Sequence, residues 1–578
     1  MKSPSRTQPS NQTASALLLT MIMTGAALAV LGSAMAWSAS NTRLTHRSIQ
    51  YNRSVAAAEA ATEKVLTQIT RDYLSGGEVT VNNNLASYRL IYPQTADSAF
   101  WNQWEFNDGA GQTARTYVQI ANATTYVVLN STFSGLRGFV RTCTVASHAR
   151  DTAALQNAVG GVLQEIQLAR IPIFQFAMYS SSDMEISCGQ PFTINGKVHS
   201  NSKLYVEPGS VLTFQSDVTA VSDILFQRHP LDTRAAPTGS AIYEIPKLTP
   251  VSAMTLPIGI TNTPEAIREI IQPAPTGENP NSPLGRLRYH NMADMVVVVS
   301  NASISASSGR FNNFATTIPA SEVAAMFTTT NSFVDAREEK TVRPLDINIA
   351  ALKAWSQTNA TLRVALGARD VSSLYVLDLR TLAGTDLAAV RVRNGTNLPS
   401  LGLTVATARP LYVLGNYNQT NASNLGTSNT VNTAPASLVA DAITILSTAW
   451  TDGNSGSLVA LRNAAATTVN AALLTGVVET TLNQYSGGME NFPRFLETWG
   501  LANALRYNGS MVKMFPSLYA TNVWGKANVY SPPKRDWAYD VNFNDAAKLP
   551  PLTPSLLKVV RGKWVTVAAG SNVAPPSP

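Results

Sequence analysis

The sequence predicts an α+β protein, mostly β, in which one long N-terminal helix precedes a β-rich region and an irregular, parallel β-helix-like solenoid. Three observations predict this fold. An uncharged run from Thr13 to Thr42 is long enough for a membrane-spanning helix. Short strand-like segments follow one another closely from residue 196 to residue 224, separated by Asn-Gly and Pro-Gly turns. Finally, 45% of the residues are hydrophobic but only 14% are charged.

Length and composition limit the class of protein. A chain of 578 residues is too long for one ordinary hydrophobic core, so we expect roughly two to four domains. Its charged content lies well below the roughly 25% that is usual for soluble domains, which favours an exported protein with a neutral polar surface. The net charge of +7 is spread thinly, and no cluster of Lys and Arg alternates with aromatic residues. Nucleic acid is therefore not expected as a partner.

The N-terminal apolar segment has the length of a membrane anchor. As a helix, residues 16–37 span about 33 Å, enough to cross the hydrocarbon core of a bilayer. The short polar segment 1–12 favours a cytoplasmic N-terminus and a body outside the inner membrane. A cleaved secretory signal is the alternative, because Ala34-Met35-Ala36 fits a signal-peptidase site. The expected anchor residues are Leu17, Leu18, Leu19, Ile22, Leu28, Val30, Leu31 and Trp37.

The helical pattern continues beyond the apolar segment. No Pro or Gly interrupts the run from Ser33 to Leu74, and Gly76-Gly77 follows it. We therefore predict one helix over residues 13–75, whose second half is amphipathic and docks a globular body. The apolar stripe, with spacings of three and four, consists of Val55, Ala58, Thr62, Val65, Ile69 and Tyr73.

In this region the chain resembles type IV pilin-like proteins. An apolar helix that runs into an Ala-rich stretch with the sequence AAEAA, residues 57–61, is similar to the N-terminal region of PilX-type minor pilins. Segments within residues 170–450 and 490–555 resemble large PilX-like bacterial envelope proteins. The resemblance implies a minor pilin or pilus-assembly protein whose N-terminal helix binds other pilin-like subunits. It implies no catalytic residue.

The rest of the chain is expected to be mainly strands. Residues 76–153 form a small β-rich region, and residues 154–171 form a helical linker. The solenoid occupies residues 154–470, since several apolar runs do not alternate with polar residues and few helices lie between them.

The solenoid is predicted to be irregular and capped. We find no fixed repeat length, and we expect helical or irregular excursions at residues 264–271 and 333–355. Residues 471–578 are rich in aromatic residues and proline and are expected to cover the exposed end of the solenoid.

Few side chains are candidates for chemistry. The sequence contains no G-x-S-x-G, P-loop, H-E-x-x-H or C-x-x-C motif, so no metal and no cofactor is expected. His199 is the histidine best placed for a role, with a hydrogen-bonded core position as the simpler interpretation. Glu207, Asp217 and Asp223 are the acidic residues of segment 196–224, and the pattern alone does not tell whether they meet.

Two further features leave alternatives open. Cys143 and Cys188 allow one disulfide in an oxidising compartment, and two unpaired buried thiols are the alternative. Trp101 and Trp104 could form a stacking platform for surface glycans, while packing of a loop over a sheet is the simpler interpretation.

These observations predict a membrane-anchored structural or assembly protein of the bacterial cell envelope, such as a minor pilin, a pilus-tip component or an adhesion module, and not an enzyme. The alternative is a secreted parallel β-helix enzyme that degrades polysaccharide after removal of a signal peptide. That alternative predicts a cluster of carboxylates on one face of the solenoid.

Overall fold

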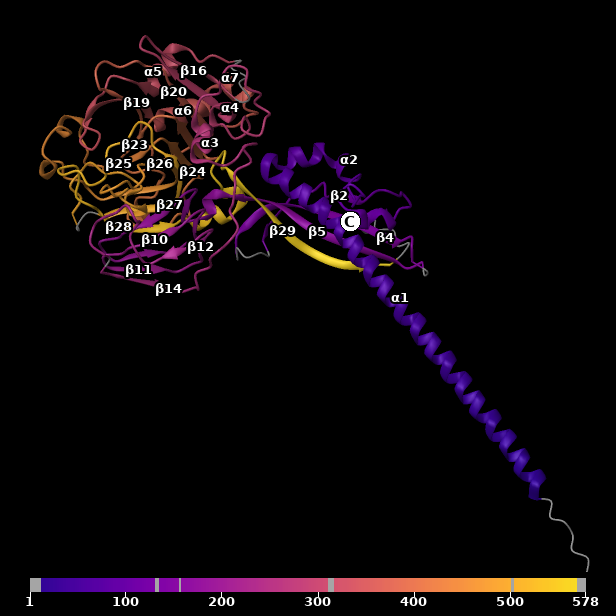
Figure 1. Cartoon of the computed structure of the whole chain (residues 1–578). Helices are drawn as coiled ribbons and strands as arrows, with labels where there is room; N and C mark the ends of the chain where they lie inside the picture. The colour runs from indigo at the N-terminus through magenta and orange to yellow at the C-terminus, as the bar shows by residue number, and fades with distance from the viewer. Residues whose placement is uncertain are drawn as a thin grey trace, which may run out of the picture.

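The computed structural model describes residues 12–129, 135–154, 157–236, 238–309, 316–500 and 504–568. A long helix, α1, projects from a small domain, and a large β-rich head lies at the opposite end of that domain (Figure 1). The prediction of a long N-terminal apolar helix followed by a β-rich body is therefore confirmed. The predicted cytoplasmic segment 1–12 lies outside the described residues except for Gln12.

Helix α1 (Gln12–Asn83) is one element with a kink at Gly77, whose φ of 69° suits glycine. The predicted end at Gly76-Gly77 is therefore a bend, after which the chain stays helical to Asn83 and then forms α2 (Leu85–Tyr88). The predicted stripe is the buried face of the second half. Val55 is half-buried, and the fully buried members are Ala58, Thr62, Val65, Ile69 and Tyr73.

The small domain is an antiparallel sheet that packs against this stripe. In spatial order its strands are β1 (Trp104–Asn107), β4 (Arg137–Asp151), β5 (Val159–Pro172) and β29 (Ser555–Val567), and β2 (Tyr117–Ile120) and β3 (Thr125–Val128) also pair with β4. Its core joins Val65, Ile69 and Tyr73 of α1 to Val145 and Ile166 of the sheet. Each large apolar side chain buried here contributes about 1.5–3 kcal/mol, which holds the helix on the sheet.

Residues 154–171 do not form the predicted helical linker. Most of this segment is β5, which pairs antiparallel with β4 on one side and β29 on the other. At Gly160 an added Cβ would lie 2.5 Å from the Val55 nitrogen, so glycine permits close approach of α1 and the strand. Pairing on both edges and contact with α1 outweigh the local helical spacing.

The head is inserted between two neighbouring strands of the small sheet. Pro172 at the end of β5 is the register partner of Ser555 at the start of β29. Residues 173–554 therefore leave the small sheet and return to it at one place, and the head has two adjacent covalent connections to the small domain.

The predicted C-terminal cap over residues 471–578 is wrong. β29 belongs to the small domain, and the three strands before it belong to the largest sheet of the head. The side chains of β26 and β27 are buried on both faces, so these strands belong in a sheet interior. The strands concerned are β26 (Thr467–Val477), β27 (Ala504–Pro516) and β28 (Lys534–Tyr539).

The first part of the head contains a repeat of 20 residues, although the sequence was expected to have no fixed repeat length. Three sets of short strands pair in parallel, two of them as separate sheets and one as the end of the largest sheet, and paired residues such as His199 and Thr219 lie 20 residues apart. The sequence signal is the recurrence of Ser180-Ser181-Ser182 as Ser200-Asn201-Ser202, each before an apolar strand. The sets are β6 (Met178–Ser180), β9 (Val198–Ser200) and β12 (Val218–Ala220); β7 (Met184–Ile186), β10 (Leu204–Val206) and β13 (Ile224–Leu225); and β8 (Phe192–Ile194), β11 (Val211–Phe214) and β14 (Ser240–Tyr243).

The second part of the head runs back toward the first. One row of parallel strands ends on β27, which pairs with β26 and with β6 and so joins the two parts into one sheet. A second row forms another sheet. The first row is β15 (Met295–Val299), β20 (Ser373–Asp378), β22 (Leu403–Thr407), β24 (Ala436–Ala440) and β26, and the second is β19 (Lys340–Asn348), β21 (Leu387–Arg393), β23 (Leu411–Leu414) and β25 (Ile443–Leu446).

One of the two predicted excursions is helical. Residues 264–271 form α3 (Pro264–Arg268) and a following 3-10 turn, with Thr263 as the N-cap. Residues 333–355 are mostly strand, because β18 (Phe333–Asp335) pairs with β19. Helix α6 (Ile349–Thr358) begins only after the end of β19. Pairing of β19 with β18 and β21 explains this difference.

Candidate functional site

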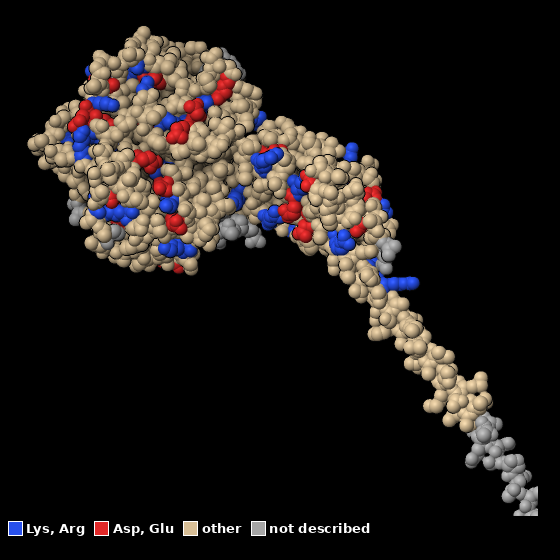
Figure 2. All heavy atoms as spheres, viewed as in Figure 1, with Lys and Arg blue, Asp and Glu red and all other residues tan. Residues whose placement is uncertain are grey.

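The exposed first half of α1 is the most unusual surface of the molecule. Every residue from 16 to 49 is exposed, and Leu17, Leu28 and Trp37 expose 67%, 62% and 70% of their surface. The other predicted anchor residues, Leu18, Leu19, Ile22, Val30 and Leu31, are exposed as well. Figure 2 shows no charged side chain along the outer part of this projection. Apolar surface of this extent indicates an environment other than water.

The polar side chains on this segment are compatible with such an environment. The hydroxyl of Thr20 donates to the Leu17 carbonyl at 2.9 Å, and that of Thr24 donates to the Thr20 carbonyl at 2.6 Å. Ser33 donates to the Val30 carbonyl at 2.9 Å. Hydrogen bonds within the helix satisfy these donors without water, as a bilayer requires.

Among the described residues, one helix is long and apolar enough to cross a membrane, with a window of mean hydropathy 2.0. An N-terminal secretory signal has the same property. This helix differs from a secretory signal in its second half, which continues without a break and packs on the small domain. There the Arg561 guanidinium on β29 donates to Glu63 at 2.5 and 2.8 Å, and the Ser54 hydroxyl donates to the Ala158 carbonyl at 2.9 Å.

The aromatic residues that suggested a glycan platform pack against α1. Trp104 and Phe106 share a buried cluster with Ala57, Ala58 and Ala61 of the helix. The rings of Trp101 and Phe106 lie 5.9 Å apart between centroids. Small alanine side chains allow the rings to approach the helix closely. These aromatic residues therefore serve packing, the simpler of the two interpretations.

The three acidic residues of segment 196–224 are placed at different corners of the stacked strands. Asp217 follows β11 and forms an ion pair with Lys197, whereas Asp223 precedes β13. Glu207 follows β10, is fully buried and accepts hydrogen bonds from Arg228 at 2.6 Å and Arg234 at 3.3 Å. The structure therefore does not bring these three carboxylates together.

Three carboxyl groups, those of Glu185, Glu207 and Glu490, lie near enough to the Tyr485 hydroxyl to raise its pKa further than burial alone does. Burial raises the pKa of Glu207 to about 8, and the nearby Glu185 carboxyl acts in the same direction while Arg228 opposes it. Burial also raises the pKa of Glu185 and of Glu490. All three side chains are buried, and Glu490 accepts from the Tyr485 hydroxyl at 3.1 Å. Sequence reasoning missed this group because Glu490 comes from a distant part of the chain.

The remaining candidates are structural. His199 is buried, its Nδ1 lies 2.8 Å from the Thr219 hydroxyl and its Nε2 lies 2.9 Å from the Asn201 side-chain oxygen. Burial lowers the pKa of His199 to about 4. Within the described ranges, no group of three or more His, Cys, Asp or Glu side chains is arranged to hold a metal ion.

The disulfide alternative is not realised. Cys143 lies in the core of the small domain and Cys188 in the core of the head, and both thiols are free and buried. Burial raises the pKa of each thiol to about 12, which keeps it protonated. The two cysteines belong to separate cores, which explains why they do not meet.

The chain was compared with families, curated proteins and solved structures. No family model matches the chain, and no curated protein matches it in sequence. The chain is similar to the competence-associated pilin ComZ from Thermus thermophilus, with 11% sequence identity, a TM-score of 0.30, and coverage of 90% of this chain and 97% of that chain. A TM-score this low carries no argument about fold or function.

Proposed function

We propose that this protein is a membrane-anchored, pilin-like structural or assembly protein of the bacterial cell envelope. The observation that carries the proposal is the continuity of α1, whose exposed apolar half runs without a break into a half that packs on an antiparallel sheet. A signal peptide that is removed gives no reason for this continuity. The continuity is explained if the helix holds the domain at a membrane, or if it packs with the same helix of other subunits.

The proposed orientation has the N-terminus in the cytoplasm and the body outside the inner membrane. Its partners would be the lipid bilayer and other pilin-like subunits, both bound by the anchor residues. PilX-type minor pilins have an N-terminal region similar to this one, and we propose a related role here.

The position of the head supports a place at the tip of an assembly. The head lies at the end of the small domain that is remote from the projecting helix (Figure 1). If the helices bundled in parallel, a subunit added beyond this one would need the space that residues 173–554 occupy. We therefore propose a pilus-tip component or adhesion module, in which the stacked parallel strands form a β-helix-like support.

We also propose that the protein is not an enzyme. The carboxylates that surround Tyr485, namely Glu185, Glu207 and Glu490, are buried, and each accepts a hydrogen bond. A glycosidase needs two carboxyl groups that reach the scissile bond of the substrate. Surface glycans remain a proposed partner class, which a glycan array tests directly with the wild type and a Trp101→Ala variant.

The mature N-terminus and the cell fraction test the main proposal. We expect mass spectrometry to find Leu17 to Ala36 in the mature chain, and the protein to sediment with membranes or with sheared filaments. A soluble mature chain that begins at Trp37 would refute the anchor and favour the secreted enzyme. Detergent should extract the protein from the membrane fraction, whereas high salt should not, because apolar contacts hold the protein in the membrane.

A further inference from the structure

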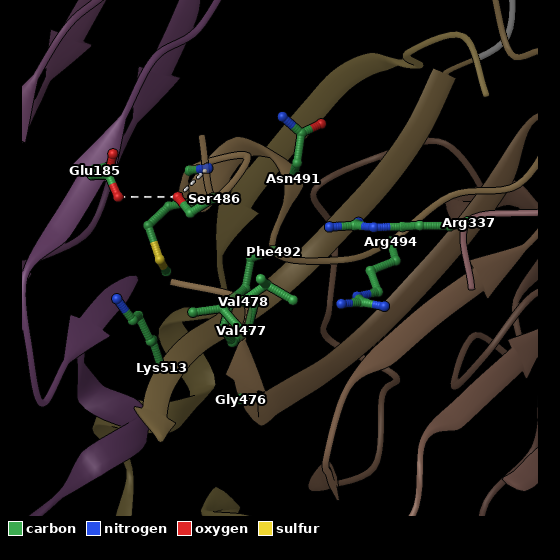
Figure 3. A pocket seen from close by; sticks show the side chains of 12 residues that line it. Glu185, Arg337, Gly476, Val477, Val478, Ser486, Asn491, Phe492, Arg494 and Lys513 are labelled. Atoms are coloured by element: carbon green, nitrogen blue, oxygen red, sulfur yellow. Dashed lines mark hydrogen bonds between the residues drawn. The ribbon is translucent and has the colours of Figure 1, made fainter. Parts of the chain in front are cut away.

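A cleft of about 530 Å³ lies in the head. This volume falls within the range of about 300–1,000 Å³ that is usual for sites of small ligands. Its walls come from the turn after β7, the loop before β14, the 3-10 turn at Met489–Asn491 and the chain between β27 and the start of β28. An adjoining cavity, which Glu185, Asn491 and Lys513 line, has a volume of about 20 Å³ and therefore room for about one water molecule (Figure 3). Of the two, the cleft has the size for a larger ligand.

Two aromatic side chains of the cleft are held in place by hydrogen bonds. The indole Nε1 of Trp524 donates to the Tyr530 hydroxyl at 2.8 Å, and that hydroxyl donates to the Asn491 side-chain oxygen at 2.7 Å. Asn491 is buried and donates to the Gly487 carbonyl at 2.7 Å. Trp524 also packs edge to face on Tyr485, with 5.5 Å between the ring centroids. The rings are therefore ordered without a ligand, and binding does not have to immobilise them.

Arg535 brings a guanidinium into the same cleft. Its Nε donates to the Glu490 backbone carbonyl at 2.6 Å and its Nη2 to the Asn491 side-chain oxygen at 2.7 Å, and both acceptors are neutral. Burial raises the pKa of the Glu490 carboxyl and favours its neutral form, although Arg535 opposes this effect. Lys526 is a second cation of the lining, and the Glu339 carboxylate that pairs with it at 2.6 Å is 66% exposed. Surface ion pairs of this kind are weak, so a ligand can compete for Lys526.

The aromatic surface and the guanidinium lie within the span of one disaccharide. Three successive hydrogen bonds connect Trp524 to Arg535, so Trp524 Nε1 and Arg535 Nη2 are no farther apart than these bonds together, about 8 Å. Ser187 and Gln190 add a hydroxyl and an amide to the lining, and such groups bind sugar hydroxyls. A pyranose ring packs its C–H groups on an aromatic face, and the planar fork of arginine suits a carboxylate.

We propose that this cleft binds a saccharide that carries a carboxylate, such as a hexuronate, with a sugar ring on Trp524 and the carboxylate on Arg535. Lys526 adds positive potential that attracts such a ligand. The inference deepens the proposed contact with surface glycans and rests on that part of the proposed function, but it does not depend on the membrane anchor. Among the described residues that line the cleft, Glu490 is the only one with a carboxyl group, whereas a glycosidase needs two. We therefore expect binding without cleavage.

A glycan array tests the ligand class with the detergent-solubilised full chain. The probes are uronate- and sialate-bearing glycans, and each is printed beside its carboxyl-reduced counterpart, which has the same rings but no charge. We expect the acidic glycans to bind about tenfold or more tightly than the reduced ones, because the reduced glycans lose a charge-assisted hydrogen bond. Equal binding of the acidic and reduced glycans would overturn the assignment of a carboxylate.

The variant Trp524→Ala tests the place of binding. It should weaken binding of the acidic glycans by about tenfold, since the sugar ring loses its aromatic support. Trp564→Ala is the matched control, because Trp564 is 46% exposed on β29 of the small domain, and it should bind as the wild type does. Array binding that Trp524→Ala leaves unchanged would overturn the cleft but leave surface glycans as a partner class. Absence of binding to every glycan would overturn both, and membrane fractionation would still decide the anchor separately.

The variant Arg535→Gln tests the role of the charge. It should remove the preference for acidic over reduced glycans, whereas Arg343→Gln, at a half-exposed position that pairs with Asp386, should keep it. Because Arg535 also holds Asn491, thermal unfolding of the variant must show that the head is folded. If it is not, Lys526→Gln replaces it, and a severalfold loss of acidic-glycan binding is expected. An unchanged preference in a folded Arg535→Gln, or unchanged binding in Lys526→Gln, would refute the electrostatic part of the proposal.

Discussion

Pro172 and Ser555 face each other across β5 and β29, although residues 173–554 separate them in the chain. The sheet of the small domain is therefore complete only when β29 has returned to it. This relationship makes the head an insertion and makes β29 a structural part of the small domain.

Removal of the head should leave a folded small domain. Joining Pro172 to Ser555 through an Asn-Gly turn replaces the insertion by a tight hairpin, which suits two antiparallel neighbours. We expect the shortened chain to give a cooperative thermal transition by circular dichroism. A chain that ends at Pro172 lacks β29 and exposes the edge of β5, so it should aggregate or lose that transition. Equal behaviour of the two chains would contradict the role assigned to β29.

A charge in the middle of the anchor should prevent stable membrane association. Leu28→Lys places an ammonium group at the centre of the apolar segment, at a cost of about 2.5–3.5 kcal/mol. We expect the membrane fraction of the protein to fall severalfold in cell fractionation. Thr42→Lys is the control, because Thr42 lies beside Arg43 at the end of the segment. Equal membrane recovery of both variants would argue against an anchor.

Gly160 should resist substitution because α1 passes close to it. Gly160→Ala puts a Cβ 2.5 Å from the Val55 nitrogen, and the helix must shift. We expect a loss of about 1–3 kcal/mol in the free energy of unfolding, measured with denaturant. Gly189→Ala should change it by less than about 0.5 kcal/mol, since no atom lies within 4 Å of a Cβ there. A tolerant Gly160 would mean that the helix is not held as described.

Burial of His199 should make the head less stable in acid. Its pKa is about 4 when folded, below the unfolded value of about 6.5, so the unfolded chain binds more protons between these pH values. The stabilisation is complete above about pH 6.5 and is lost as the pH falls to about 4, by about 3 kcal/mol.

The slope of stability against pH isolates this residue. Burial also lowers the pKa of His148 and His290, so part of the acid sensitivity should remain in a His199→Gln variant. Denaturant unfolding at several pH values should show a shallower slope for His199→Gln than for wild type. His46→Gln, at an exposed position on α1, should keep the wild-type slope. An unchanged slope in His199→Gln would refute the prediction.

Local patterns predicted α1 well because its two halves differ in composition. The apolar anchor and the stripe from Val55 to Tyr73 follow from spacing alone, and a helix satisfies its own backbone wherever it lies. The strands of the first part of the head were also predictable, as short apolar segments between turns. Their repeat of 20 residues was present in the sequence, in Ser180 to Ser182 and Ser200 to Ser202, but was not recognised.

Pairing between distant segments decided the rest. The segment 154–171 has helical spacing, yet it becomes β5 because β4 and β29 bind both of its edges. The aromatic C-terminal region was predicted to cap the solenoid. Instead, its strand β27 pairs with β26 and β6 and joins the two parts of the head. A strand, unlike a helix, needs a partner for every backbone hydrogen bond, and the sequence does not name that partner.

The sequence by itself determined an apolar helix that continues into an amphipathic half, a strand-rich body and the absence of familiar catalytic motifs. Only the tertiary structure decided that the head is inserted between Pro172 and Ser555, that Cys143 and Cys188 belong to separate cores, and that Arg494 forms a buried ion pair with Glu338. The reason is that helical periodicity is a local property, whereas strand partners and the compensation of buried charge depend on residues far apart in the chain.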